Sequence, residues 1–153
     1  MEIFDPVERL LNEPYLLVDL FPKRVPADCA TRYFSAERFF LSDPQHAEIA
    51  ERFVRFLLKL NCYEAFRFID PGTDESFEPA DAEAAANALR ACLHSETPAA
   101  LLILLPDADA LITLDRDDLY LTLYHPSPAL TETVRMLAAA EGLFAREPEP
   151  ENA

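Results

Sequence analysis

Five segments carry the hydrophobic patterns of β-strands. Residues 99–105 form a continuous apolar run, short enough for a strand that is buried on both faces near the centre of a sheet. Residues 110–115 and 119–124, joined by Arg116-Asp117-Asp118, predict an antiparallel hairpin. Its second strand would place Leu119, Leu121 and Leu123 on one face and Tyr120, Thr122 and Tyr124 on the other. Two further strands are predicted over residues 15–21 and 61–69.

Helical spacing of the apolar side chains alternates with these strands. Asp5-Pro6 begins a short helix, Ser42 caps a long helix that runs to about residue 60, and Ser127 begins a last helix that Gly142 ends. An alanine-rich helix is expected over residues 79–95. Residues 33–41 fit a strand by their aromatic content or a short helix capped by Ser35, and we assign them to a helix.

The predicted element order is α-β-(α)-α-β-α-β-β-β-α, which indicates an α+β fold. We expect one globular domain over residues 1–145, with a mixed, mostly antiparallel sheet of about five strands and three to four helices. The order of the strands in the sheet does not follow from the sequence. Residues 146–153 are acidic and interrupted by prolines, which predicts a disordered tail.

The amino-acid composition limits the kinds of partner and location that we expect for this chain. Half of the 153 residues are hydrophobic, with 11 Phe and 5 Tyr, as expected for a folded domain. The net charge of −15 argues against nucleic acid as a partner, because phosphate binding requires a basic surface. The imbalance is uneven, with a net charge of −5 through Ser76 and −10 from Phe77 onward. No leader or membrane span is recognisable in the sequence, so a cytoplasmic location is expected.

Cofactor and metal chemistry finds little support. Only two glycines occur, which excludes a glycine-rich phosphate loop, and the three widely spaced cysteines form no zinc or dithiol motif. We therefore predict no cofactor. Five carboxylates flank one predicted strand and would suit a hard cation, but their spacing does not match an EF-hand and aspartate is a common turn residue. The five are Asp107, Asp109, Asp115, Asp117 and Asp118.

The sequence contains isolated cysteine and histidine side chains that could serve as nucleophiles or bases. Cys92 and His94 are two positions apart on a predicted helix and point in different directions, so Cys92 is expected in the core. Cys29 lies in a basic loop, where neighbouring cations favour the thiolate. His125 follows a predicted strand, where it could act as an acid or base, and Asp115 and Asp117 are candidates to orient it. None of these groups forms a catalytic motif.

Three functions stay open at this level, and we lean against an enzyme. The first is a protein-interaction or regulatory module without catalysis, with a homodimer as one form of it. Its expected binding residues are those of the basic loop, the exposed strand face and the strand end, namely Lys23, Arg24, Arg32, Tyr120, Tyr124 and His125. The second is a small enzyme or ligand-binding protein with a site near His125 and Asp115, drawing on Tyr124 and Cys29. The third is an acidic inhibitor or immunity-type protein that blocks a basic surface.

Overall fold

A computed structural model describes residues 4–149 and confirms a single α+β domain. Its strands form one sheet of seven, in the order β3-β2-β4-β5-β6-β1-β7, and every neighbouring pair is antiparallel. The strands are β1 (Tyr15–Asp19), β2 (Arg67–Ile69), β3 (Ser76–Phe77), β4 (Ala100–Leu105), β5 (Ala110–Asp115), β6 (Tyr120–Tyr124) and β7 (Phe144–Arg146). All five predicted strands are present, and β4 lies inside the sheet between β2 and β5.

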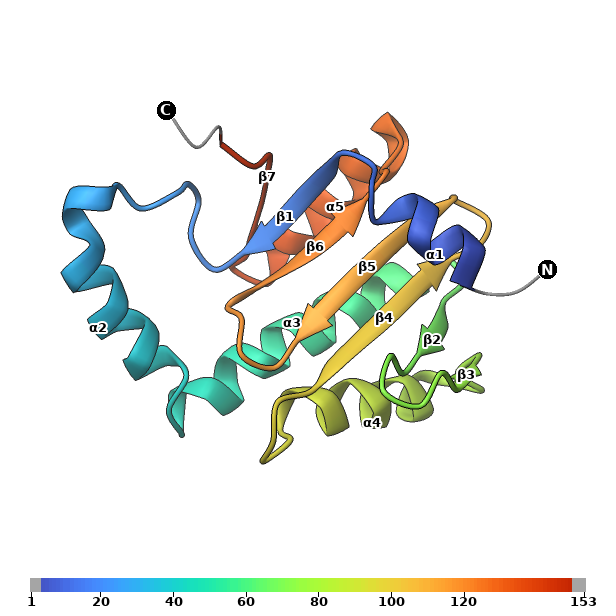
Figure 1. Ribbon diagram of the computed structural model, residues 1–153, viewed down its shortest axis with the longest axis horizontal. Helices are drawn as coiled ribbons and strands as arrows, with labels where there is room; N and C mark the ends of the chain where they lie inside the picture. The colour runs from blue at the N-terminus through green and yellow to red at the C-terminus, as the bar shows by residue number, and fades with distance from the viewer. Residues whose placement is uncertain (1–3, 150–153) are drawn as a thin grey trace.

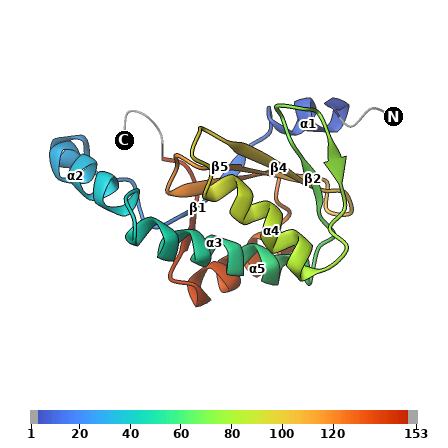
Figure 2. The same cartoon turned by 90° about the horizontal axis from the view of Figure 1, so that it is seen from below.

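Five helices accompany the sheet among the described residues, where three to four were expected. They are α1 (Phe4–Leu10), α2 (Ala30–Phe40), α3 (Gln45–Asn61), α4 (Ala82–Leu93) and α5 (Pro128–Ala140). Helices α3, α4 and α5 cover one face of the sheet, and α1 lies on the other (Figures 1 and 2). Helix α2, drawn in light blue, projects to one side of this layered body (Figure 1). The helical assignment of residues 33–41 is therefore confirmed.

The main core lies between the sheet and the three helices on one face. Helix α3 buries seven side chains in it, because its apolar residues recur at helical spacing along one broad stripe. Leu121 and Leu123 of β6 point into the same core, while Tyr120 and Tyr124 alternate with them on the opposite face, as the hairpin pattern predicted. On that opposite face, α1 packs Val7 and Leu10 over β2, β4 and β5.

The helix ends predicted from the sequence are partly confirmed. Asp81 and Ser127 each accept a backbone N–H with their side chain and cap α4 and α5, so α4 begins after Asp81 rather than at Pro79. The predicted Ser42 cap of α3 is wrong, because the Ser42 hydroxyl donates to the Arg38 carbonyl of α2 instead. Strand β2 is also shorter than predicted, since α3 continues to Asn61.

Gly142 places the last strand. It has a φ of 71°, a left-handed conformation that glycine adopts without strain, and the Leu143 N–H then donates to the Ala138 carbonyl at 2.9 Å. The chain turns back and adds β7 to the edge of the sheet, with Leu17 opposite Arg146 and Asp19 opposite Phe144. Strand β7 thus includes Arg146, the first residue of the predicted tail, while residues 150–153 of that tail lie outside the described residues.

Candidate functional site

The segment that follows β1 leaves the sheet and forms an arm, which we define as residues 22–41. Pro22 and Pro26 have no N–H for a sheet ladder, so the strand does not continue past this point. A 3₁₀ turn over Ala27–Cys29 then leads into α2. The arm thus consists of a proline-bounded basic loop and one helix, and it stands beside the sheet rather than over its core (Figures 1 and 2).

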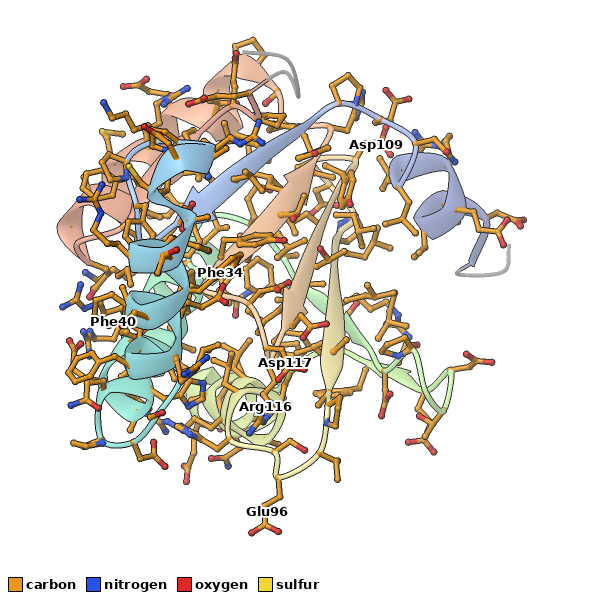
Figure 3. All side chains as sticks on the ribbon, turned by 60° about the vertical axis from the view of Figure 1, so that its left-hand side comes forward. Phe34, Phe40, Glu96, Asp109, Arg116 and Asp117 are labelled. Atoms are coloured by element: carbon orange, nitrogen blue, oxygen red, sulfur yellow. The ribbon has the colours of Figure 1, made fainter. Side chains whose placement is uncertain are left out.

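The helix of the arm buries none of its residues. Phe34 and Phe39 are 58% and 55% exposed, and because they are five positions apart they point to different sides of the helix. Figure 3 shows Phe34 on the side of α2 that faces the sheet. A helix of this length is marginal in water by itself, so its contacts with the body decide whether it forms.

Those contacts centre on one aromatic side chain of the body, Phe21. Its ring lies 5.7 Å from that of Tyr33 and 6.4 Å from that of Phe40, measured between ring centres. The Tyr33 hydroxyl donates to Glu37 at 3.1 Å, and partial burial together with this carboxylate raises the pKa of Tyr33 to about 12. A small aromatic cluster at the base and inner side of α2 therefore holds the arm.

Like charges meet where the arm approaches the β5–β6 turn. Partial burial, the neighbouring Asp115 and Asp117, and Glu37 of the arm raise the pKa of Asp118 to about 6. At neutral pH, Asp118 is therefore ionised in a negative environment to which the arm contributes. This repulsion opposes the aromatic contacts, so the attachment of the arm to the body is weaker than its rings alone suggest.

Between the basic loop and the body lies a cavity of about 270 Å³, which we call the arm pocket. Lys23 and Arg24 of the loop, Tyr33 and Phe34 of α2, and Phe21 are among its lining residues. At its base the Arg146 guanidinium donates twice to one carboxylate oxygen of Asp19, from Nη2 at 2.7 Å and from Nε at 3.1 Å. The other oxygen of Asp19 accepts the Phe21 N–H at 3.2 Å.

The arm differs in charge from the rest of the chain. It holds four basic side chains, Lys23, Arg24, Arg32 and Arg38, and two acidic ones, for a net charge of +2. Because the whole chain has a net charge of −15, the residues outside the arm have a net charge of −17. The sequence had indicated one basic loop in an acidic protein, and the structure joins that loop to an exposed aromatic helix.

Of the two tyrosines predicted on the exposed strand face, Tyr120 lies near the arm and Tyr124 does not. Tyr120 is 37% exposed at the end of β6 beside the Asp118 turn, and its charge interactions include Asp19 at the pocket. Tyr124 lies at the other end of β6, where its ring contacts that of Tyr15 at 5.5 Å. Thr122 between them is buried. The predicted binding face is thus divided, and only its Tyr120 end lies beside the arm.

His125 does not share a site with Asp115. Its Nδ1 lies 2.8 Å from the Asp109 carbonyl oxygen, and Asp109 is paired with Arg9 at 2.5 Å. Tyr124 faces Leu111 at the start of β5, whereas Asp115 is the last residue of that strand, so the two groups lie at opposite ends of the sheet. The convergence of His125, Asp115, Tyr124 and Cys29 that a catalytic site would need is not found.

The five aspartates are divided in the same way. Asp109 and Asp117 lie at opposite ends of the strands (Figure 3). The Asp115 carboxylate accepts the Asp117 N–H at 2.9 Å, which is the turn chemistry favoured from the sequence. Across residues 4–149, no group of three or more His, Cys, Asp or Glu side chains is placed to hold a metal ion.

The cysteines separate as expected. Cys92 is 7% exposed in the core, where burial raises the pKa of its thiol to about 11. The Cys29 sulfur accepts a hydrogen bond from Arg32 at 3.1 Å at the start of α2. The ring centre of His94, near the end of α4, lies 5.9 Å from that of His46 in α3. The pKa of His46 is lowered, mainly by its burial and also by the neighbouring His94.

Sequence reasoning missed the residues that define the arm pocket besides its two loop cations. Phe21 was assigned to a strand, Phe34 to an ordinary helix, and Arg146 to the tail. The aromatic content of residues 33–41 could have pointed to this site. The segment has too few polar positions for a helix that is fully solvated and no clear apolar stripe for a helix that packs on a core.

Comparisons of the chain with models of protein families, with curated proteins and with solved structures found no match. Within the described range, no helix combines the length and the apolar character that a membrane crossing requires.

Proposed function

We propose that this chain is a protein-interaction module without catalysis of its own, which binds its partner through the arm. The observation that carries the proposal is the exposure of Phe34 and Phe39 on a helix with no buried residue. Aromatic side chains supply much of the binding energy at protein interfaces, and a folded chain gains nothing from presenting two of them to water on one short helix.

Charge adds a second line of support. The arm has a net charge of +2 on a chain that is otherwise strongly negative, so it would attract an acidic surface that the body repels. Charge complementarity of this kind sets orientation and association rate more than affinity. The aromatic side chains would then provide the affinity.

The alternatives have less support. The enzyme hypothesis required His125 and Asp115 to converge, and they lie at opposite ends of the sheet. The hypothesis of an acidic inhibitor stays a prediction, with the charge of −17 outside the arm as its support. A homodimer is one form of the proposed interaction, in which the arm of one copy meets the acidic body of another.

Site-specific photocrosslinking tests the proposal. A photoreactive phenylalanine is introduced at position 34 or 39, and at Tyr63 or Met136 as controls, which are 69% and 60% exposed and lie outside the arm. In the cells that naturally make the protein, irradiation is expected to give a discrete adduct from positions 34 and 39 only. An adduct of twice the chain's mass identifies a second copy. Equal labelling from all four positions, or none, contradicts the proposal.

A further inference from the structure

A second hollow lies around the start of β1, whereas the arm follows the end of that strand. The hollow has a volume of about 780 Å³, and we call it the β1 hollow. Its lining includes Glu13 and Tyr15 at the start of β1, His125 after β6, and Glu147 with Pro148 after β7. Strand β1 begins beside α1 and points toward α2 (Figure 1). The β1 hollow and the arm are therefore separate surfaces beyond opposite ends of one strand.

The β1 hollow contains two carboxylates that stay available for a cation. Within residues 4–149, neither Glu13 nor Glu147 forms a salt bridge. Glu13 interacts electrostatically with Arg9, but the Arg9 guanidinium is paired with the Asp109 carboxylate instead. The hollow therefore holds negative charge that another molecule can neutralise.

His125 and Tyr15 add an acceptor and an aromatic ring to the same hollow. The His125 Nδ1 lies 2.8 Å from the Asp109 carbonyl oxygen. A carbonyl oxygen only accepts, so Nδ1 carries the hydrogen and Nε2 of the neutral ring is an acceptor. The Tyr15 ring is 40% exposed. Carboxylates, an acceptor nitrogen and an aromatic face together favour a guanidinium or ammonium group as the ligand.

One side of α2 carries groups that complement this chemistry. Arg32 and Phe39 are seven positions apart, close to two full turns, so they lie on the same side of the helix, which we call its outer side. Both line a shallow hollow on that side. Arg32 is exposed, and its Nη2 donates to the Cys29 sulfur at 3.1 Å, with no salt bridge among the residues that the structure describes. Phe34 and Arg38 lie on the inner side, where Phe34 faces the sheet (Figure 3).

From this arrangement we infer that the partner of the arm is a second copy of this chain, and that the outer side of α2 enters the β1 hollow of that copy. The inference rests on the proposed function and names the partner and its binding surface. The Arg32 guanidinium pairs with Glu13 and Glu147 of the other copy. The Phe39 ring packs on Tyr15 of the same hollow. Because every copy carries both surfaces and they differ, the contact is head-to-tail, and it closes into a ring or continues as a filament.

The net charge of the chain determines the conditions under which this contact forms. Two copies with a net charge of −15 each repel one another at long range. At about 0.15 M salt the screening length is about 8 Å, so this repulsion is largely screened. The pairing of Arg32 with the carboxylates acts at contact distance inside a hollow and is screened less. Association is therefore measured at this salt concentration.

Sedimentation of the purified full chain tests the inference with two variants that each disable one surface. R32E reverses the charge on the outer side of α2, and E13K-E147K reverses it in the β1 hollow. The mass of the wild type is expected to rise with its concentration, and each variant alone should associate at least tenfold more weakly. An equimolar mixture of the two variants should associate again, because one chain retains the hollow and the other retains the arm.

Matched charge reversals elsewhere separate the proposed contact from a general effect of charge. R38E makes the same change as R32E on the inner side of α2. E75K-E96K makes the same change as the hollow variant at two exposed glutamates in loops, which do not line the hollow. Both controls should associate within threefold of the wild type.

Three results overturn the inference: a wild type that stays monomeric at millimolar concentration, equal weakening by the variants and their matched controls, or a mixture that does not associate although the wild type does. Urea unfolding of each variant, with a midpoint near that of the wild type, excludes misfolding as the cause. Failure here is distinguishable from failure of the proposed function. If positions 34 and 39 crosslink to a different protein while the wild type is monomeric, the arm has another partner and the proposed function stands.

Discussion

The pair formed by Asp19 and Arg146 fixes both β7 and the floor of the arm pocket, and replacing Arg146 with Met should destabilise the fold strongly. The Asp19 side chain is 7% exposed and that of Arg146 is 18% exposed. Removing the guanidinium leaves a nearly buried carboxylate whose remaining hydrogen-bond donor, among residues 4–149, is the Phe21 N–H. Breaking a buried ion pair typically costs about 3–5 kcal/mol, and the position of β7 at the edge of the sheet favours the lower value, about 3 kcal/mol.

The matched control is the double variant D19N-R146M, which removes both charges and retains similar side-chain volume. Replacing both members of a buried pair is often close to neutral, so its free energy of unfolding should lie within about 1 kcal/mol of the wild type. Urea unfolding followed by circular dichroism at pH 7 measures both variants. A loss of less than about 1 kcal/mol in R146M, or a double variant at least as unstable as R146M, would show that the pair does not stabilise the fold in this way.

Three further predictions concern pH and the independence of the arm from the core. D118N should stabilise the protein by about 1 kcal/mol at pH 7 and by little at pH 4, a value discounted for the exposure of this side chain. Because the pKa of Asp118 is raised to about 6 in the folded protein, stability is lost as pH rises through about 6. An equal gain in D118N at both pH values, or the same effect in D117N, would show that ionisation of Asp118 is not the cause. The pKa of His46 is lowered in the folded protein, so the unfolded chain binds a proton more readily and the melting temperature should fall as pH drops below about 6.5. The fall should be smaller in H46Q, and parallel curves for H46Q and the wild type would contradict this. L57A should cost about 2–5 kcal/mol in urea unfolding and F34A less than about 0.5 kcal/mol, and similar losses would mean that the arm is part of the core.

The fold was predictable where a local signal and the tertiary structure agree. The five predicted strands, the α5 cap at Ser127 and the stop at Gly142 follow from side-chain spacing and backbone chemistry that act within a few residues. Strands β3 and β7 were missed because they have two and three residues and, unlike the equally short β2, lie in no longer alternating segment of the sequence. Their existence depends on an open sheet edge that only the assembled fold provides.

The candidate site was predictable only in fragments. Lys23 and Arg24 were identified as a basic loop, because charge can be counted from the sequence. That this loop shares a pocket with Arg146, more than a hundred positions away, depends on the edge position of β7 beside β1. The separation of His125 from Asp115 could not be predicted for the same reason, since two positions that are near in sequence across a hairpin can lie at opposite ends of antiparallel strands.

The most direct test of the central claim, that the arm serves binding rather than folding, compares two double variants in native cell extract. F34S-F39S alters the arm, and Y63S-M136S replaces two side chains elsewhere that are slightly more exposed than Phe34 and Phe39. Sedimentation of the tagged chains, combined with urea unfolding of the purified proteins, gives both quantities. Both variants should have wild-type stability, and only F34S-F39S should sediment as the 17.3 kDa monomer instead of a larger complex. Identical sedimentation of the wild type and both variants would contradict it.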